Sequence, residues 1–227
     1  LDEITIIPEL LRVLALKGCI VTVDAIGCHK SVAEQVIDRQ GDYVLAVKAN
    51  QPKLLDHVRQ IFDREERQLH RDLSVDTFET HDENHGRMET RRYWTTDQVD
   101  DFADWTAWKG LGLFGMVETQ RQVGDQVSVE RRYYIASLDN DAQRFGEAVR
   151  SHWSIENSLH WVLDVVFRED DSRVRTGHAP ENLALLRQIA VSLLQQEKTA
   201  KVGVQTKRLK AGWDNTYLAK VLSAGHF

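Results

Sequence analysis

The sequence predicts an α/β protein built in three successive parts. Over residues 1–51, short β-branched runs alternate with segments of helical periodicity. Over residues 52–140, several strand-like runs separated by turn residues follow one another. Helical periodicity then returns over residues 141–227. We therefore expect a parallel unit, a mostly β insertion and a helical end, with boundaries after residues 51 and 140.

The first part has the pattern helix, strand, helix, strand. Apolar residues at helical spacing run from Ile7 to Leu16 and stop at Lys17-Gly18, a basic last turn followed by glycine. A β-branched run predicts a strand over Cys19–Val23, and capping-box spacing opens a helix from Ser31 to about Gln40. The next strand covers Tyr43–Lys48. A strand, a short helix and a second strand predict two parallel strands with a right-handed crossover.

The other two parts follow the same logic. A helix starts at Pro52 and covers Lys53 to about Glu66. The strand-like runs after it are Thr77–Thr80, Met88–Thr95, Gly115–Thr119 and Val127–Ser137. Five arginines lie in or beside these runs: Arg91, Arg92, Arg121, Arg131 and Arg132. The last part predicts one long or two abutting helices over Asp141–Phe167, a helix from Pro180 to about Glu197, a basic patch at Lys207-Arg208-Leu209-Lys210 and a short helix over Tyr217–Leu222.

Composition and charge narrow the class of protein. The 227 residues are 42% hydrophobic and 28% charged, which is typical of a globular protein. No run approaches the roughly 18 apolar residues of a membrane span, and the first residues do not form a basic-plus-apolar leader, so we expect a cytoplasmic protein without membrane contact. Cys19 and Cys28 have neither zinc-site nor disulfide spacing and are expected to be reduced. The net charge of −6 argues against binding to a DNA backbone, unless metal-site carboxylates and a basic segment before Leu1 account for it.

Two segments carry residues suited to catalysis. Asp24 ends a predicted parallel strand, at the edge where open α/β sheets place ligands, although a surface aspartate starting a turn has the same pattern. Further along, a polar column repeats every four residues on one predicted helix: His152, Glu156, His160 and Asp164. A solvated helix face gives the same spacing. A zinc site is less favoured, because the two histidines are eight residues apart.

Longer motifs resemble a known family. The segments Ile20–Cys28 and Gly41–Gln51 look like DDE transposases of bacterial insertion sequences. The segments His152–Asp170, Ala179–Arg187 and Ala211–Asp214 are similar to the H-repeat-associated subgroup of that family. These matches run in order along essentially the whole chain.

The resemblance implies an RNase-H-like core and three carboxylates that bind Mg²⁺ or Mn²⁺. Asp24 corresponds to the second and Glu156 to the third, whereas no residue matches the first, so we expect a missing N-terminal region. The implied activity is cleavage and strand transfer of double-stranded DNA, with homo-oligomers on DNA expected by family analogy. An inactive remnant, a DNA-binding or regulatory fragment, and a metal-dependent nuclease are the alternatives.

The wider family motif around the last carboxylate is not kept, because Val149, His152 and Leu163 stand where tyrosine, arginine and lysine are usual. His152 would replace the lost charge only when protonated. The residues expected to contact DNA are Lys48, Asn50, Arg150, His152, Arg173 and Arg175. Lys48 and Asn50 could instead shape the turn before Pro52. Arg173 and Arg175 could instead pair with Glu169, Asp170 or Asp171.

Overall fold

The structure is a computed structural model that describes residues 3–68, 74–84, 87–155 and 159–223. The chain divides into two compact units, Leu1–His152 and Trp153–Phe227. Within the described ranges, no helix combines the length and the apolar character that crossing a bilayer requires.

The first unit is a mixed α/β structure, which confirms the expected class. Its helices are α1 (Glu3–Val13), α2 (Lys30–Asp38), α3 (Pro52–Gln68) and α4 (Ala142–Ile155), with short 3₁₀ turns η1 (Ala25–Gly27) and η2 (Trp105–Ala107). Its strands are β1 (Ile20–Val23), β2 (Asp42–Val47), β3 (Val75–Asn84), β4 (Arg87–Thr96), β5 (Leu113–Val123) and β6 (Gln126–Ala136). The parallel pairing of β1 with β2 agrees with the strand–helix–strand prediction.

All six strands form one sheet in the order β1-β2-β6-β5-β4-β3. β2 pairs antiparallel with β6, with Val44 opposite Ala136 and Val47 opposite Tyr133. The strands of residues 52–140 therefore extend the sheet that β1 and β2 begin. The two compact units divide after His152. The boundaries expected after residues 51 and 140 stay a prediction.

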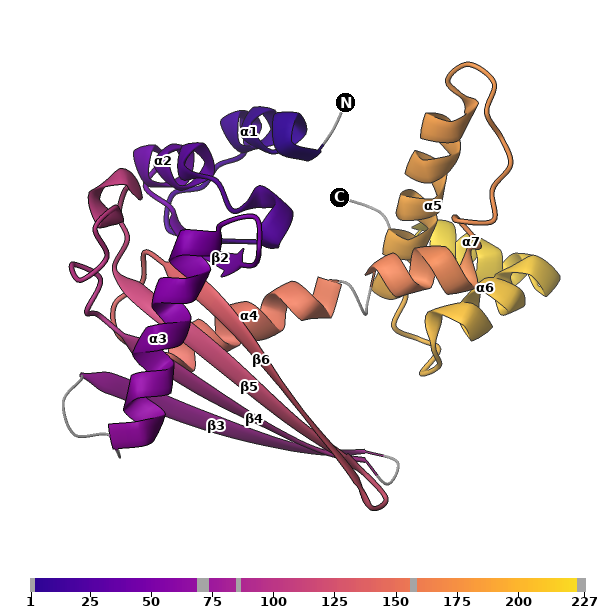
Figure 1. Cartoon of the computed structure of the whole chain (residues 1–227). Helices are drawn as coiled ribbons and strands as arrows, with labels where there is room; N and C mark the ends of the chain where they lie inside the picture. Colours follow the sequence, from indigo (N-terminus) through magenta and orange to yellow (C-terminus); the bar gives the residue numbers. More distant parts are fainter. Residues whose placement is uncertain (1–2, 69–73, 85–86, 156–158, 224–227) are drawn as a thin grey trace. The chain divides into compact units, whose positions relative to one another are not determined.

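Helices cover both faces of this sheet, α3 on one face and α4 on the other (Figure 1). We call these the α3 face and the α4 face. The main core lies on the α3 face, where Leu54, Val58 and Phe62 of α3 join buried residues of α1, α2 and the sheet. On the α4 face, Phe145 packs so closely on β5 that a Cβ at Gly115 would lie 2.5 Å from its Cζ. Glycine at position 115 therefore lets α4 approach the sheet.

The second unit contains a π-helical segment η4 (Val162–Val166) and the helices α5 (Ala179–Gln196), α6 (Val204–Trp213) and α7 (Asn215–Ser223). Two apolar clusters hold it together, one around Val162 and Val191 and one around Leu194 and Tyr217. For Asp141–Phe167 the sequence predicted one long or two abutting helices. The described residues there form α4 up to Ile155 and the π-helical segment η4 over Val162–Val166, and residues 156–158 lie outside the described residues.

The expected basic patch lies in α6, but its side chains are used within the unit. Lys207 is buried and donates to the carbonyl oxygens of Leu194 and Glu197. Arg208 donates to the carbonyl of Val166, and the Lys210 ammonium lies 4.4 Å from the centre of the Tyr217 ring. These contacts stabilise the packing of α5, α6 and α7, so this run is not a simple exposed basic surface.

Both cysteines are free, as expected. Cys19 is exposed, whereas Cys28 is buried beneath the turn that follows β1. Burial raises the pKa of the Cys28 thiol to about 12, which keeps it protonated and unreactive at neutral pH.

Candidate active site

Asp24 follows the last residue of β1 and is exposed. Its Oδ1 accepts a hydrogen bond of 3.1 Å from the backbone N–H of Ile26, so that it caps the short η1 turn. Within the described ranges, no lysine, arginine or histidine forms an ion pair with it. An exposed carboxylate without a basic partner suits a divalent cation, which prefers hard oxygen ligands.

The loop after β2 holds the turn that carries Asp24. Asn50 Nδ2 donates to the carbonyl of Ala25, and Gln51 Nε2 donates to the carbonyl of Cys28 at 2.9 Å. Asn50 therefore has a structural role at the turn, and its predicted contact with DNA stays a prediction. The two hydrogen bonds fix the backbone on either side of Gly27.

Replacing Gly27 with alanine should disturb this turn. A Cβ at position 27 would overlap Val23 Cγ1 and lie 3.0 Å from Ile7 Cδ1. Because Val23 is a β-branched strand residue, it cannot move away cheaply. We expect Gly27→Ala to lower the free energy of unfolding by about 1–3 kcal/mol, as overpacking usually does. Urea denaturation followed by circular dichroism measures the change.

Gly203→Ala is the matched control, because nothing lies within 4 Å of a Cβ built there. Equal denaturation midpoints for the two variants would show that the turn tolerates the extra methyl group.

Thr22 connects β1 to α4. Val21 and Val23 pack against the core of the α3 face, and successive strand side chains alternate, so Thr22 points to the α4 face. There the Thr22 Oγ1 lies 3.1 Å from His152 Nδ1, within hydrogen-bond distance. The backbone at Asp24 is still extended, with φ −70° and ψ −179°, so the alternation places Asp24 on the same face as Thr22.

The sequence did not single out Thr22, although its position two residues before Asp24 is the signal that could have identified it. Its contact with His152 brings the last turns of α4 to β1. His152 was expected from the sequence, and it is half-buried at this contact.

Glu156, the other predicted metal ligand, lies outside the described residues. Further along the polar column, His160 and Asp164 are exposed. Trp161 is 53% exposed and so is not part of the core. The described ranges contain no group of three histidine, cysteine, aspartate or glutamate side chains arranged to hold a metal ion.

The other predicted DNA contacts lie in different parts of the fold. Lys48 is exposed directly after β2, near the turn that holds Asp24. Arg150 lies on α4 and forms an ion pair of 3.2 Å with Asp82. In the second unit Arg173 is exposed, and Arg175 donates to the carbonyls of Ser172 and Val174.

The acidic run beside Arg173 and Arg175 pairs with other arginines. Glu169 lies 3.6 Å from Arg187, and Asp171 lies 3.8 Å from Arg168. Among the described residues, the acidic run therefore pairs with Arg168 and Arg187, and not with Arg173 or Arg175 as the alternative required.

Comparison with known proteins gives a consistent result. A family model for the transposase DDE domain matches residues 2–193. The chain is 41% identical to "Putative transposase YncI" of Escherichia coli O157:H7 and 40% identical to "H repeat-associated putative transposase YhhI" of Escherichia coli K12. Each match covers 98% of this chain but only 57% and 59% of the respective relative. No solved structure matches the chain.

Proposed function

The chain belongs to the DDE transposase family, and from this premise we propose that it carries part of a centre that cuts DNA and joins it to a target. The observation that carries the proposal is the position of Asp24. Asp24 follows the last residue of β1, and its exposed carboxylate lies on the α4 face. On that face Thr22 contacts His152, which precedes Glu156 by four positions. The chain spans under three fifths of the length of the relatives named above, so the proposal concerns the whole protein of which this chain is a part.

We assign Asp24 and Glu156 as two ligands of Mg²⁺ or Mn²⁺. When bound, such ions activate the attacking hydroxyl and stabilise the leaving oxygen of a phosphodiester. Asp24 keeps its orientation through the hydrogen bond from Ile26, and the Asn50 and Gln51 side chains hold the turn in place. A third carboxylate, for which no residue of this chain is a match, would complete the set.

The proposed architecture is an RNase-H-like core. Residues 1–51 would form its first part, 52–140 the inserted strands, and 141–227 the helices that complete it. The parallel pair β1 and β2, with Asp24 at the carboxyl end of β1, supports this assignment because ligands bind at that edge of α/β sheets.

The proposed substrate is double-stranded DNA, bound by a homo-oligomer. Lys48, Arg150, His152, Arg173 and Arg175 would contact its phosphates. The Thr22 hydroxyl beside His152 Nδ1 orients the imidazole, which carries a positive charge for a phosphate only when it is protonated.

A plasmid assay tests the proposed reaction. The product of the complete reading frame is mixed with Mg²⁺ and a supercoiled plasmid that carries the ends of the element, and joined and nicked products are separated on a gel. We expect joined products from the parent protein and none from Glu156→Gln, because glutamine keeps the shape but loses the charge that holds the metal. Glu147→Gln, an exposed glutamate on α4, is the matched control and should keep full activity.

Three outcomes contradict the proposal in different ways. Full strand transfer by Glu156→Gln removes Glu156 from the site. Nicked DNA without joined products identifies a nuclease. DNA binding without any cleavage identifies a remnant or regulatory fragment.

A further inference from the structure

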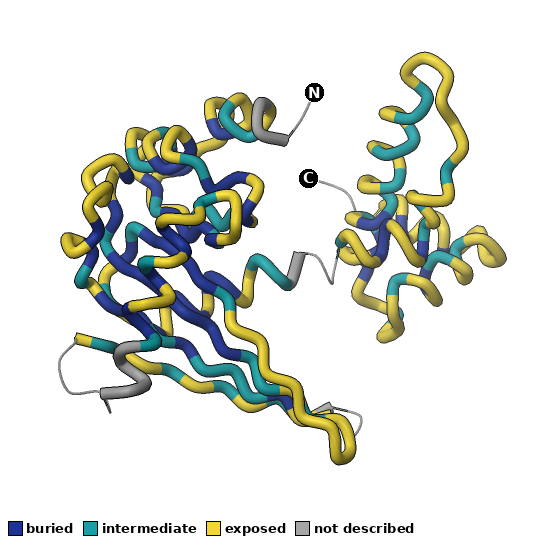
Figure 2. Tube along the Cα trace, viewed as in Figure 1, coloured by how far each residue is buried: buried dark blue, intermediate teal, exposed yellow. Residues whose placement is uncertain are grey.

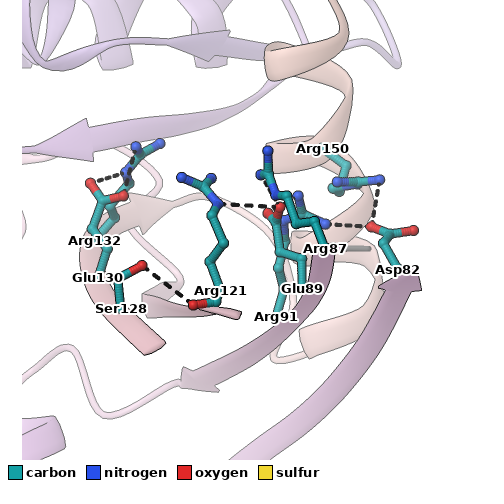
Figure 3. Close-up of polar contacts among 9 residues, drawn as sticks. All are labelled: Asp82, Arg87, Glu89, Arg91, Arg121, Ser128, Glu130, Arg132 and Arg150. Atoms are coloured by element: carbon teal, nitrogen blue, oxygen red, sulfur yellow. Dashed lines mark hydrogen bonds and ion pairs between the residues drawn. The ribbon is translucent and has the colours of Figure 1, made fainter. Parts of the chain in front are cut away.

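The arginines of β4, β5 and β6 divide between the two faces of the sheet. Trp94, Met116 and Tyr133 pack in the core of the α3 face. Successive strand side chains alternate between the faces, so Arg92, two positions from Trp94, and Arg131, two positions from Tyr133, also lie on the α3 face. Residues an even number of positions apart on one strand are said to share a parity. The opposite parity carries Tyr93 and Tyr134, which contact Phe145 of α4. Arg87, Arg91, Arg121 and Arg132 have this second parity, so they lie on the α4 face, as Figure 3 shows.

The two faces carry different clusters of paired charges. On the α3 face, Arg92 and Arg131 pair with Glu79 and Glu118, two cations with two anions. On the α4 face, the cluster of charged residues labelled in Figure 3 consists of Arg87, Arg91, Arg121, Arg132 and Arg150 with Asp82, Glu89 and Glu130. Within this cluster the arginines outnumber the carboxylates by two, while Asp76 of β3 and Glu147 of α4 lie on the same side of the sheet outside it. We call the five arginines the arginine face: Arg87, Arg91, Arg121, Arg132 and, from α4, Arg150.

One nearly buried carboxylate organises the arginine face. Glu89 is 6% exposed and forms ion pairs with Arg87 and Arg91, while Arg121 Nε lies 3.6 Å from its Oε2. Burial alone would raise the pKa of Glu89, but these guanidinium groups outweigh burial and lower it. Glu89 is therefore ionised at neutral pH, yet it neutralises only one of its three partners.

The same face also carries the candidate active site. Asp82 pairs with both Arg91 and Arg150, so the cluster joins β3 and β4 to α4. His152, which follows Arg150 by two positions on α4, contacts Thr22, and Thr22 lies on the same face of the sheet as Asp24. The outer ends of β5 and β6 are exposed, as Figure 2 shows, and Arg87, Arg121 and Arg150 are each between 45% and 47% exposed.

We propose that the arginine face binds the phosphodiester backbone of double-stranded DNA and leads it toward Asp24. This inference rests on the proposed function, because it assigns a DNA-binding surface beside the proposed metal ligand. Guanidinium groups match phosphate oxygens in a bidentate geometry, and within this cluster the arginines outnumber the carboxylates by two on a chain with a net charge of −6.

The width of the surface allows contact with several phosphates of a nucleic acid. From β4 to β6, the strands that carry its sheet arginines, it crosses two gaps between neighbouring strands, about 10 Å in all. A DNA strand presents one phosphate per roughly 3.4 Å of helix axis, so a duplex whose axis follows this width presents about three phosphates on each strand along it. An extended acidic peptide has a similar spacing, about 3.3 Å per residue, so the choice of DNA rests on the proposed strand-transfer site on the same face.

The test measures DNA affinity of the 227-residue chain in EDTA, where no metal-dependent reaction occurs. The double variant Arg121→Gln/Arg132→Gln leaves Glu89 paired with Arg87 and Arg91. The control Arg59→Gln/Arg92→Gln makes the same change in charge on the α3 face, where Arg59 lies over the Tyr133 ring and Glu118 keeps Arg131. Circular dichroism melts verify that both variants are folded. Fluorescence anisotropy of a labelled duplex gives Kd between 50 and 200 mM KCl.

We expect the first variant to bind more weakly than the parent and the control to bind like the parent. Each lost phosphate contact removes about 0.9 from the slope of log affinity against log salt, so the advantage of the parent should shrink about tenfold over this range. Equal slopes for the two double variants would overturn the proposal. So would competition by polyglutamate that matches unlabelled DNA at equal charge, which would identify an acidic protein as the partner.

Asp24→Asn separates this inference from the proposed function. In one outcome, Asp24→Asn yields no joined DNA but keeps the parental slope of log affinity against log salt, and the arginine variants bind DNA like the parent. This outcome rejects only the arginine face. If Asp24→Asn joins DNA normally while the arginine variants lose affinity, only the proposed catalytic role of Asp24 is rejected.

Discussion

Asp24→Asn should lower the rate of strand transfer by about a thousandfold or more in the plasmid assay. Asparagine keeps an oxygen that can accept the hydrogen bond from Ile26, and it is a good capping residue, so the η1 turn should remain intact. What is lost is the negative charge and one strong metal ligand. A bound metal ion stabilises the charge of the transition state by several kcal/mol. Losing about 4 kcal/mol of this stabilisation lowers the rate about a thousandfold. Single-turnover measurements of joined product at saturating Mg²⁺ give the value.

Asp141→Asn is the matched control for this prediction. Asp141 is also exposed, and its Oδ1 also accepts a backbone hydrogen bond, from Arg144 at 2.9 Å, at the opposite end of α4 from His152. It should keep parental activity and DNA affinity. A loss of less than about tenfold for Asp24→Asn, with normal folding, would remove Asp24 from the catalytic centre.

The position of Asp24 could be predicted because it depends on local patterns. A β-branched run predicts the strand β1, which is half-buried and not fully buried as expected, and helical spacing predicts the crossover to β2. The capping box expected at Ser31 was wrong, because α2 begins at Lys30 with His29 as its N-cap and Ser31 lies inside the helix. Together the strand and helix patterns imply parallel pairing, and parallel pairing places the residue after β1 at the functional edge of the sheet.

The extent and faces of the later strands could not be predicted in this way. β5 was expected over Gly115–Thr119 but covers Leu113–Val123. In its outer half, charged residues pair with residues of neighbouring strands, so the alternation of apolar and polar residues that marks a strand is missing there. Whether Arg121 or Arg131 lies on the α4 face depends on register, which is set by long-range pairing. The arginine face therefore emerges only from the folded sheet.

The run at Lys207-Arg208-Leu209-Lys210 shows the same limit for charge. Its composition predicts a basic surface, yet Lys207 is buried beneath the end of α5. Its Nζ lies 3.7 Å from Glu197 Oε2 and donates to two carbonyls, so it belongs to a network in which Lys207 and Glu197 are buried. A single sequence carries no mark that separates such a lysine from its exposed neighbours.

Glu197 is the anionic centre of that network. It accepts hydrogen bonds from Thr199, the Ala200 backbone and the Tyr217 hydroxyl, the last at 2.7 Å. The hydrogen bonds from Thr199 and Tyr217 lower the pKa of Glu197 from 4.5 to about 2. Because the pKa is depressed in the folded state, its contribution to stability is fully present above about pH 4.5 and is lost as the pH falls through 2.

Lys207→Met should destabilise the chain by about 3–5 kcal/mol at pH 7, because it removes the buried cation while Glu197 stays charged. It also leaves the carbonyls of Leu194 and Glu197, at the end of α5, without their donor. Urea denaturation at pH 7 measures the loss. Lys210→Met, one turn further along α6, removes only the contact with the Tyr217 ring and should cost about 0.5–1 kcal/mol. Equal midpoints for the two variants, or a gain in stability for Lys207→Met, would show that an apolar side chain can replace Lys207 and that the network does not depend on its charge.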